Sequence, residues 1–132
     1  MCPAKVTRAV DLAVAHCEAW SNHDWDEARE RLASDVKVTA TTTMAGAPNT
    51  DLSGVDAYME GLRAFAGQFV PGSLRVNASA GDEHNALLHV SVDADGPPFG
   101  PVTVHGARLY LFDESDKLVS EQVIFYLAGR EG

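Results

Sequence analysis

The second half of the chain consists of four strand-like segments in succession, and this run constrains the fold more than any other feature. The segments are SLRVNASA, NALLHVSVDA, VTVHGARLYLF and KLVSEQVIFYL, at residues 73–80, 85–94, 102–112 and 117–127. Their alternation and their content of β-branched and aromatic residues are typical of strands. Turn-forming residues separate them: Gly81 to His84, the segment DGPPFGP, and Asp113 to Asp116. Short connections between consecutive strands predict an antiparallel meander.

The first half predicts three helices and one strand. Helical patterns cover residues 5–20, residues 25–33 with Asp24 as the cap, and residues 55–69, where Ser53 and Asp56 form a weak capping box. Residues 35–43 alternate like a strand, and residues 45–54 are expected to form a loop. The predicted inner positions are Val6, Val10, Ala13, Val14, Cys17 and Trp20 in the first helix, and Val55, Met59, Leu62, Phe65, Ala66 and Phe69 in the third.

This order of elements predicts an α+β fold in a single domain that spans residues 1–132. One strongly curved, mainly antiparallel sheet would carry the three helices of the N-terminal half on one face. Helices folded against a curved sheet enclose a cone-shaped pocket, which is a natural site for a small molecule. The 132 residues, of which 45% are hydrophobic, suffice for one globular core.

The charge of the chain argues against nucleic acid and anionic membranes as partners. The net charge is −9, and no cluster of Lys and Arg occurs, whereas a phosphate-binding surface needs clustered cations. The two cysteines, Cys2 and Cys17, form no disulfide framework, and no spacing of Cys and His indicates a metal site. Cys17 lies in an apolar helical pattern and is expected to be a small core residue. The sequence shows neither a membrane-spanning run nor a signal peptide, so we expect a cytoplasmic protein.

Two opposite charges lie on the apolar faces of the last two strands. Arg108 shares a face with Val104, Gly106, Tyr110 and Phe112, and Glu121 shares one with Val119, Val123, Phe125 and Leu127. If Phe112 pairs with Lys117 across the turn DESD, Arg108 lies directly opposite Glu121. A three-residue loop with Asp116 in the left-handed region would instead put the two charges on opposite sides.

The sequence leaves two interpretations of this pair open. As a cross-strand ion pair at the sheet surface, it would contribute less than about 1 kcal/mol. As a buried pair it would add little net stability, because desolvation offsets the attraction, and a functional role would then be more credible.

The opposite face of the sheet predicts a dimer. His105, Ala107, Leu109 and Leu111 share this face, as does His89 on the preceding strand. Both histidines are expected at the surface or at an interface. The apolar pair Leu109 and Leu111 indicates that the convex side is covered, and a second copy of the chain would cover it.

Nearly the whole chain resembles the nuclear transport factor 2-like superfamily, which includes ketosteroid isomerases, SnoaL-like polyketide cyclases and limonene epoxide hydrolase. The segments that carry the resemblance are the opening helix, NHDWDEARERLASDVKV, LSGVDAYMEGL and ARLYLFDESDKLVSEQVIF. The resemblance implies a cone whose pocket is lined by the concave face of the sheet. It also favours the register that brings Arg108 and Glu121 together inside the pocket.

The resemblance further implies a set of site residues. Glu121 matches the acidic residue that SnoaL-like cyclases place on the last strand, and Arg108 with Glu121 resembles part of the Asp-Arg-Asp cluster of limonene epoxide hydrolase. The ketosteroid isomerase set is absent, because His16, Ala40 and Arg108 stand where those enzymes carry a tyrosine and two carboxyl groups. The expected catalytic residues are Glu121, Arg108 and His16, and the expected substrate-binding residues are Trp20, Val38, Ala40, Leu62, Phe65, Tyr110, Val123 and Phe125.

The function expected from these residues is cofactor-independent acid–base chemistry on a small apolar molecule. Glu121 would act as acid or base, Arg108 would stabilise an oxyanion or hold Glu121, and His16 would donate to the same oxygen or relay a proton. A cyclase, an isomerase and an epoxide-opening hydrolase all fit this set. The alternative is a non-catalytic module of the same fold that binds a small ligand or dimerises, which the missing carboxylate at Ala40 favours.

Overall fold

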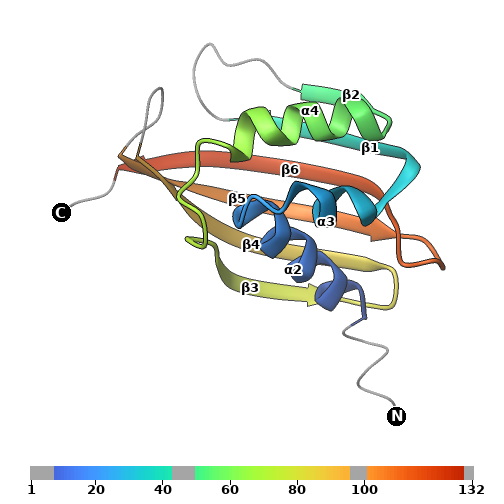
Figure 1. Cartoon of the computed structure of the whole chain (residues 1–132). Helices are drawn as coiled ribbons and strands as arrows, with labels where there is room; N and C mark the ends of the chain where they lie inside the picture. The colour runs from blue at the N-terminus through green and yellow to red at the C-terminus, as the bar shows by residue number, and fades with distance from the viewer. Residues whose placement is uncertain (1–7, 43–49, 96–100, 130–132) are drawn as a thin grey trace.

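The computed structural model describes residues 8–42, 50–95 and 101–129 and contains three helices and six strands (Figure 1). The helices are α2 (Arg8–Ser21), α3 (Trp25–Glu30) and α4 (Val55–Ala66). The strands are β1 (Leu32–Thr42), β2 (Thr50–Ser53), β3 (Arg75–Gly81), β4 (Asn85–Ala94), β5 (Val102–Phe112) and β6 (Leu118–Gly129). No helix within these ranges is both long and apolar enough to cross a membrane.

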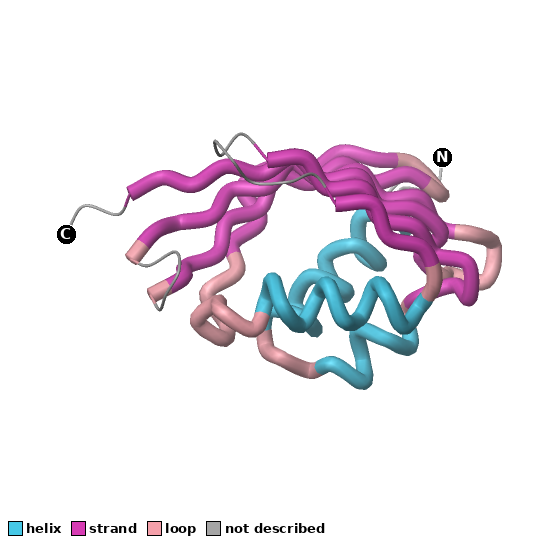
Figure 2. Tube along the Cα trace, turned by 90° about the horizontal axis from the view of Figure 1, so that it is seen from above, coloured by secondary structure: helices cyan, strands magenta, loops and turns pink. Residues whose placement is uncertain are grey.

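The six strands form one open sheet in the order β2-β1-β6-β5-β4-β3. All neighbours are antiparallel except β1 and β6, which run parallel. Figure 2 shows that the sheet is strongly bent and that the helices lie within its concave side. The structure therefore confirms the predicted α+β cone.

The core fills the space between the helices and the concave face. In α2, the predicted inner residues Ala13, Cys17 and Trp20 are fully buried, whereas Val10 and Val14 are only half-buried. Val6 lies outside the described residues. The sheet contributes apolar side chains from alternate positions of β4, such as Leu88 and Val90.

The ends of the helices follow the predictions in part. Asp24 caps α3, because its Oδ1 accepts a hydrogen bond of 3.3 Å from the backbone N–H of Glu27. The predicted capping box of α4 is wrong: Gly54 occupies the N-cap with a φ of 92°, and no side chain caps the helix. Ser53 ends a short strand instead, so the predicted loop 45–54 contains β2. Strand β2 pairs with the edge of β1 and extends the sheet.

The turn between β5 and β6 is the three-residue loop, the alternative that was expected to put Arg108 and Glu121 on opposite faces. Asp116 adopts a φ of 63°, and the N–H of Asp113 donates to the carbonyl of Lys117. Phe112 accordingly pairs with Leu118 and not with Lys117. Taken alone, this register would put the two charges on opposite faces of the sheet.

A β-bulge restores the shared face. Leu111 pairs with Ser120 and Phe112 with Leu118, so Val119 is an extra residue in β6. The bulge moves Leu118 into the core in place of the predicted Val119, and beyond it Glu121 and Val123 are buried on the concave side. Arg108 lies opposite Val123, and Tyr110 lies opposite Glu121. The two charged residues are therefore diagonal neighbours on one face. They are not directly opposite each other, as pairing of Phe112 with Lys117 would have made them.

Candidate functional site

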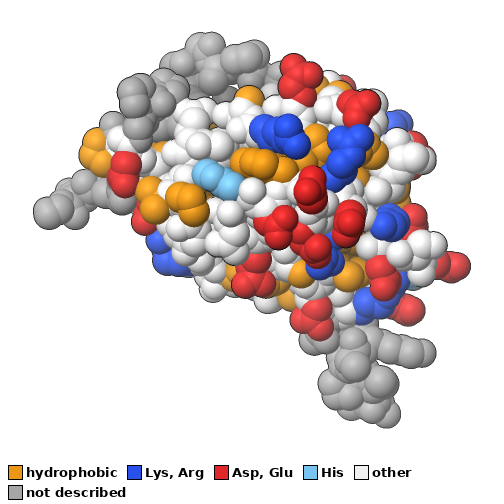
Figure 3. All heavy atoms as spheres, in the orientation of Figure 1, with side chains coloured by type: hydrophobic (Ala, Val, Ile, Leu, Met, Phe, Trp, Pro, Cys, Tyr) orange, Lys and Arg blue, Asp and Glu red, His pale blue; other side chains and the backbone are white. Residues whose placement is uncertain are grey.

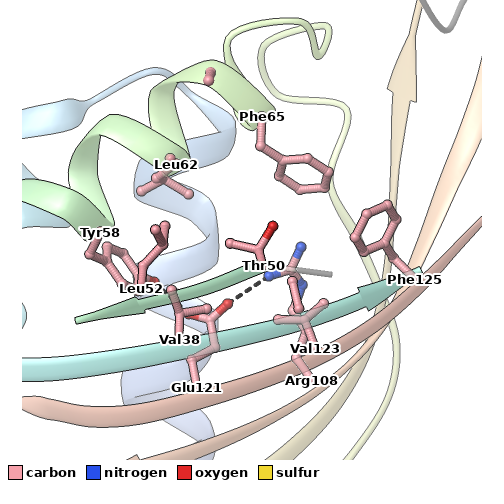
Figure 4. A pocket seen from close by; sticks show the side chains of 13 residues that line it. Val38, Thr50, Leu52, Tyr58, Leu62, Phe65, Arg108, Glu121, Val123 and Phe125 are labelled. Carbon is pink, nitrogen blue, oxygen red and sulfur yellow. Dashed lines mark hydrogen bonds and ion pairs between the residues drawn. The ribbon is translucent and has the colours of Figure 1, made fainter. Parts of the chain in front are cut away.

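A cavity of about 290 Å³ lies between α4 and the part of the sheet formed by β2, β1, β6 and β5. Its polar lining residues are Thr50, Tyr58, Arg108 and Glu121. The remaining lining is apolar: Val38, Ala40, Leu52, Gly61, Leu62, Ala64, Phe65, Val123 and Phe125. Figure 4 shows Glu121 and Arg108 on the sheet side, with Leu62 and Phe65 projecting toward them from α4.

Arg108 and Glu121 form a buried ion pair at the base of this cavity. Arg108 Nη1 donates to Glu121 Oε2 over 2.9 Å, and each side chain is 5% exposed. The pair is thus inside the fold, and the surface interpretation of these charges is wrong. Because one cation and one anion share the cavity, its lining carries no net charge in the described part of the chain.

Two aromatic rings contact the guanidinium of Arg108, and a glycine leaves space for it. Its Cζ lies 5.0 Å from the ring centroid of Trp20 and 5.9 Å from that of Phe65, which allows cation–π attraction on both. Gly106 leaves room beside it: a Cβ there would come within 3.2 Å of Arg108 Nε. Of the guanidinium donors, only Nη1 has a hydrogen-bond partner among the described residues. Arg108 lines the cavity, so a guanidinium donor other than the buried Nε can serve a ligand oxygen there.

Tyr58 is a site residue that the sequence analysis missed. Its hydroxyl donates to Glu121 Oε1 in a short hydrogen bond and also lies 2.9 Å from His16 Nε2. Tyr58 is 3% exposed and lines the cavity from the first turn of α4. The signal was present, since Tyr58 precedes Leu62 by four residues and so falls on the same helical face. Both oxygens of the Glu121 carboxylate are therefore held, one by Arg108 and one by Tyr58.

His16 belongs to the same network but lies behind the cavity wall. It is fully buried, and burial, with the positive charges of Arg108 and Arg31 as further causes, lowers the pKa of His16 to about 3. The ring is therefore neutral at pH 7. Since the single hydroxyl hydrogen of Tyr58 goes to Glu121, Nε2 of His16 must carry the hydrogen that it shares with Tyr58. Its Nδ1 is then an acceptor, and it has no partner among the described residues.

Two more predicted site residues, Trp20 and Tyr110, support the cavity from beneath and do not line it. Trp20 is fully buried and stacks on Arg108. The Tyr110 hydroxyl lies 3.1 Å from the sulfur of Cys17, and burial raises the pKa of both groups, that of Cys17 to about 11. The other predicted substrate-binding residues line the cavity: Val38, Ala40, Leu62, Phe65, Val123 and Phe125.

The chemical capacity of the site rests on one carboxylate with two direct partners, the cation Arg108 and the neutral Tyr58. Glu121 is the only carboxylate among the described residues that line this cavity. Within the described ranges, no group of three or more His, Cys, Asp or Glu side chains is placed to hold a metal ion. The arrangement suits proton transfer at a carboxylate next to a fixed positive charge.

Comparison with known proteins identifies the family of the chain. The profile of the SnoaL-like domain matches residues 13–121. No curated protein matches the chain. An uncharacterised bacterial protein with a cystatin-like fold from Silicibacter pomeroyi DSS-3 has a TM-score of 0.72 at 15% identity, covering 94% of this chain and 78% of that one.

Two further solved structures carry functional names of their own. A proposed SnoaL-like polyketide cyclase from Shewanella denitrificans OS-217 has a TM-score of 0.67 at 13% identity, with 89% of both chains covered. An LEH-like epoxide hydrolase from M. tuberculosis has a TM-score of 0.67 at 17% identity, covering 91% of this chain and 84% of that one. At these identities the likeness concerns the fold.

Proposed function

Because the chain belongs to the SnoaL-like domain family, we propose that it is a cofactor-independent acid–base enzyme acting on a small, apolar, uncharged substrate in the cone-shaped cavity. One observation carries the proposal: Glu121, 4% exposed, lies at the floor of a mostly apolar cavity, with Arg108 and Tyr58 on its two oxygens. A buried charge pair contributes little net stability. Its retention in a cavity wall therefore supports a chemical role.

The first step is removal of a proton from carbon by Glu121. A substrate carbonyl oxygen would accept a hydrogen bond from Nη2 of Arg108. Glu121 takes the proton from the adjacent carbon, the C–H electron pair forms a C=C bond, and the carbonyl electrons move to oxygen to give an enolate. The negative charge passes from the carboxylate to the enolate beside the same guanidinium. No new net charge is created in the apolar cavity, which keeps the step favourable.

The second step decides between the possible reactions. Return of the proton from Glu121 to a different carbon would complete an isomerisation, and attack of the enolate carbon on a second carbonyl of the same molecule would close a ring. In the epoxide-opening variant, Glu121 would accept a proton from an attacking water while Arg108 stabilises the oxygen released from the ring. Tyr58 holds the carboxylate of Glu121, and His16 holds Tyr58, so both are positioning residues in this arrangement.

A ligand screen followed by a turnover assay tests the proposal. Uncharged cyclic ketones, polyketide-like diketones and epoxides would be screened by thermal shift, and each stabilising compound would be assayed with wild type and with Glu121→Gln. Glu121→Gln should keep ligand binding but lose turnover by at least about 100-fold, the lower range for general acid–base catalysis. Full activity in this variant on a true substrate would refute the assignment.

The second candidate is a non-catalytic module that binds a small ligand. The observation that favours it is Ala40, which lines the cavity where a ketosteroid isomerase would carry its base. Arg108 and Glu121 would then only neutralise each other. This module predicts tight binding of a screened compound that neither wild type nor Glu121→Gln converts.

We also propose that the convex face of the sheet forms a homodimer interface. Leu87, Leu109, Leu111 and Ile124 are 40% to 56% exposed there, and Leu87 pairs with Leu109 across adjacent strands. Exposed apolar residues that adjoin on one face are typical of protein interfaces. Sedimentation should give twice the monomer mass for wild type and the monomer mass for Leu109→Glu. A monomeric wild type would exclude the dimer. The cytoplasmic location and the exclusion of nucleic-acid and membrane partners stay predictions.

A further inference from the structure

A second cavity lies toward the β3 edge of the sheet, between the C-terminal half of α2 and the start of β3. Its volume is about 310 Å³, and we call it the α2–β3 cavity. It is lined by Val14, Glu18, Ser21, Asn22, Gly72, Leu74 and Val76. None of these residues lines the first cavity, so the two sites are distinct.

The polar groups of the α2–β3 cavity favour a cation. Glu18 is exposed, and its carboxylate forms no hydrogen bond or ion pair with another described residue. Ser21 is 1% exposed, and its Oγ has no hydrogen-bond partner in the described part of the chain. Both residues lie in the last turn of α2, which contains no basic residue to offset the negative end of the helix dipole. Figure 3 shows further Asp and Glu side chains gathered over the helices.

The edge of the sheet beside this cavity is open. Strand β3 is the last strand of the sheet, and all its residues are exposed. From Val76 to Gly81 it contains no charged residue. Edge strands usually carry charges, proline or bulges that prevent pairing with another chain. The described part of β3 has two such devices, Arg75 at its first position and an irregularity between Val76 and Ala78. The remaining backbone groups of the edge can pair with an added strand.

The side chain of Val76 links the two features, because Val76 belongs to the edge strand and also lines the cavity. Val76 pairs with Val90, which is 2% exposed on the concave side, so Val76 faces the same side and lines the α2–β3 cavity. A residue opposite Val76 on an added strand would point its side chain to that side as well. A long side chain at that position would therefore project toward the cavity that Glu18 and Val76 both line.

We propose that the α2–β3 cavity and the edge of β3 together bind an extended peptide segment of a partner protein, which adds to the sheet as a strand and places an arginine side chain in the cavity. The planar guanidinium can donate to the Glu18 carboxylate and to Ser21 Oγ, and its aliphatic stem packs on Leu74 and Val14. The net charge of −9 assists the approach of such a basic segment.

Binding of a defined peptide tests this proposal. The probe is a fluorescein-labelled, end-capped peptide of sequence threonine–valine–arginine–valine–threonine, and the control peptide has glutamine in place of arginine. The protein variants are Glu18→Gln and the matched control Asp11→Asn, which removes one negative charge from an exposed position of α2 outside the cavity. Fluorescence polarisation measures affinity, and amide hydrogen exchange measures the protection of β3.

Wild type and Asp11→Asn should bind the probe equally. Glu18→Gln should bind the probe about tenfold more weakly than wild type, and wild type should bind the glutamine peptide about tenfold more weakly than the probe. Each change removes one charge-assisted hydrogen bond. The amides of β3 should gain protection on binding. No binding at millimolar peptide, equal affinity for Glu18→Gln, or equal binding of arginine amide without protection of β3 would overturn the proposal.

Discussion

Replacing one member of the buried ion pair should destabilise the protein far more than replacing both. The side chains of Arg108 and Glu121 are each 5% exposed, and their shortest contact is 2.9 Å. Arg108→Met leaves the carboxylate inside the fold with Tyr58 as its one donor, and an uncompensated buried charge costs about 3–5 kcal/mol. That loss is a large share of the roughly 5–15 kcal/mol that stabilises a typical domain.

The double variant Arg108→Met/Glu121→Leu removes both charges and fills the space with apolar atoms. Its free energy of unfolding should equal that of wild type or exceed it by about 1–4 kcal/mol, because the desolvation of two ions is no longer required. It should nevertheless have no activity, since the proposed base is gone. Such a result would separate the role of the pair in chemistry from its role in folding.

Urea denaturation followed by tryptophan fluorescence measures both variants against wild type, at equal m-values. An exposed ion pair would contribute about 0–1 kcal/mol. A loss below about 1 kcal/mol for Arg108→Met would therefore refute the burial of the pair. A double variant that is less stable than the single one would refute the claim that desolvation offsets the attraction.

Three further predictions concern the neighbours of the pair. The pKa of His16 falls from 6.5 in the unfolded chain to about 3 on folding, so between these values the unfolded chain binds one more proton and the free energy of unfolding falls as the pH is lowered. Urea titration should show a loss of about 3 kcal/mol between pH 7.5 and 4.5. The variant His16→Gln, which keeps a donor for Tyr58, should largely remove this loss. Tyr58→Phe should leave the buried Nε2–H of His16 without an acceptor, lowering the free energy of unfolding by about 1–3 kcal/mol in the same assay. Gly106→Ala should displace the Arg108 guanidinium by a few tenths of an ångström and lower kcat by about tenfold with little change in KM, whereas unchanged kcat would show that the guanidinium position is not critical.

The strands that alternate regularly could be predicted from the sequence. The structure has β4 and β5 at Asn85–Ala94 and Val102–Phe112, the same residues that the alternation indicated. Both strands lie inside the sheet with one face in the core, so every second residue must be suited to burial. The apolar environment of Arg108 and Glu121 followed from the same alternation.

Features that depend on distant contacts could not be predicted in this way. Strand β2 is four residues long and forms because the edge of β1 offers it a partner. The bulge at Val119 accompanies a contact with another part of the chain, where the N–H of Leu118 donates to the carbonyl of Arg31 over 2.7 Å. No local pattern in DESDKLVSEQ encodes that contact.

Tyr58 was missed for a different reason. Its helical position could have been recognised, but its importance comes from meeting Glu121 and His16, which are 63 and 42 residues away in the chain. A hydroxyl on an amphipathic helix shows no such partner until the helices are placed on the sheet. The family resemblance placed His16 near the oxyanion, whereas the structure puts Tyr58 between His16 and Glu121.

Hydrogen–deuterium exchange at carbon is the most direct test of Glu121 as the base. A stabilising ketone from the ligand screen would be incubated in D2O with wild type or with Glu121→Gln, and NMR would follow loss of the proton next to the carbonyl. The account predicts enzyme-dependent exchange with wild type and a rate at least about 100-fold lower with Glu121→Gln. Equal exchange rates for the two proteins would contradict it.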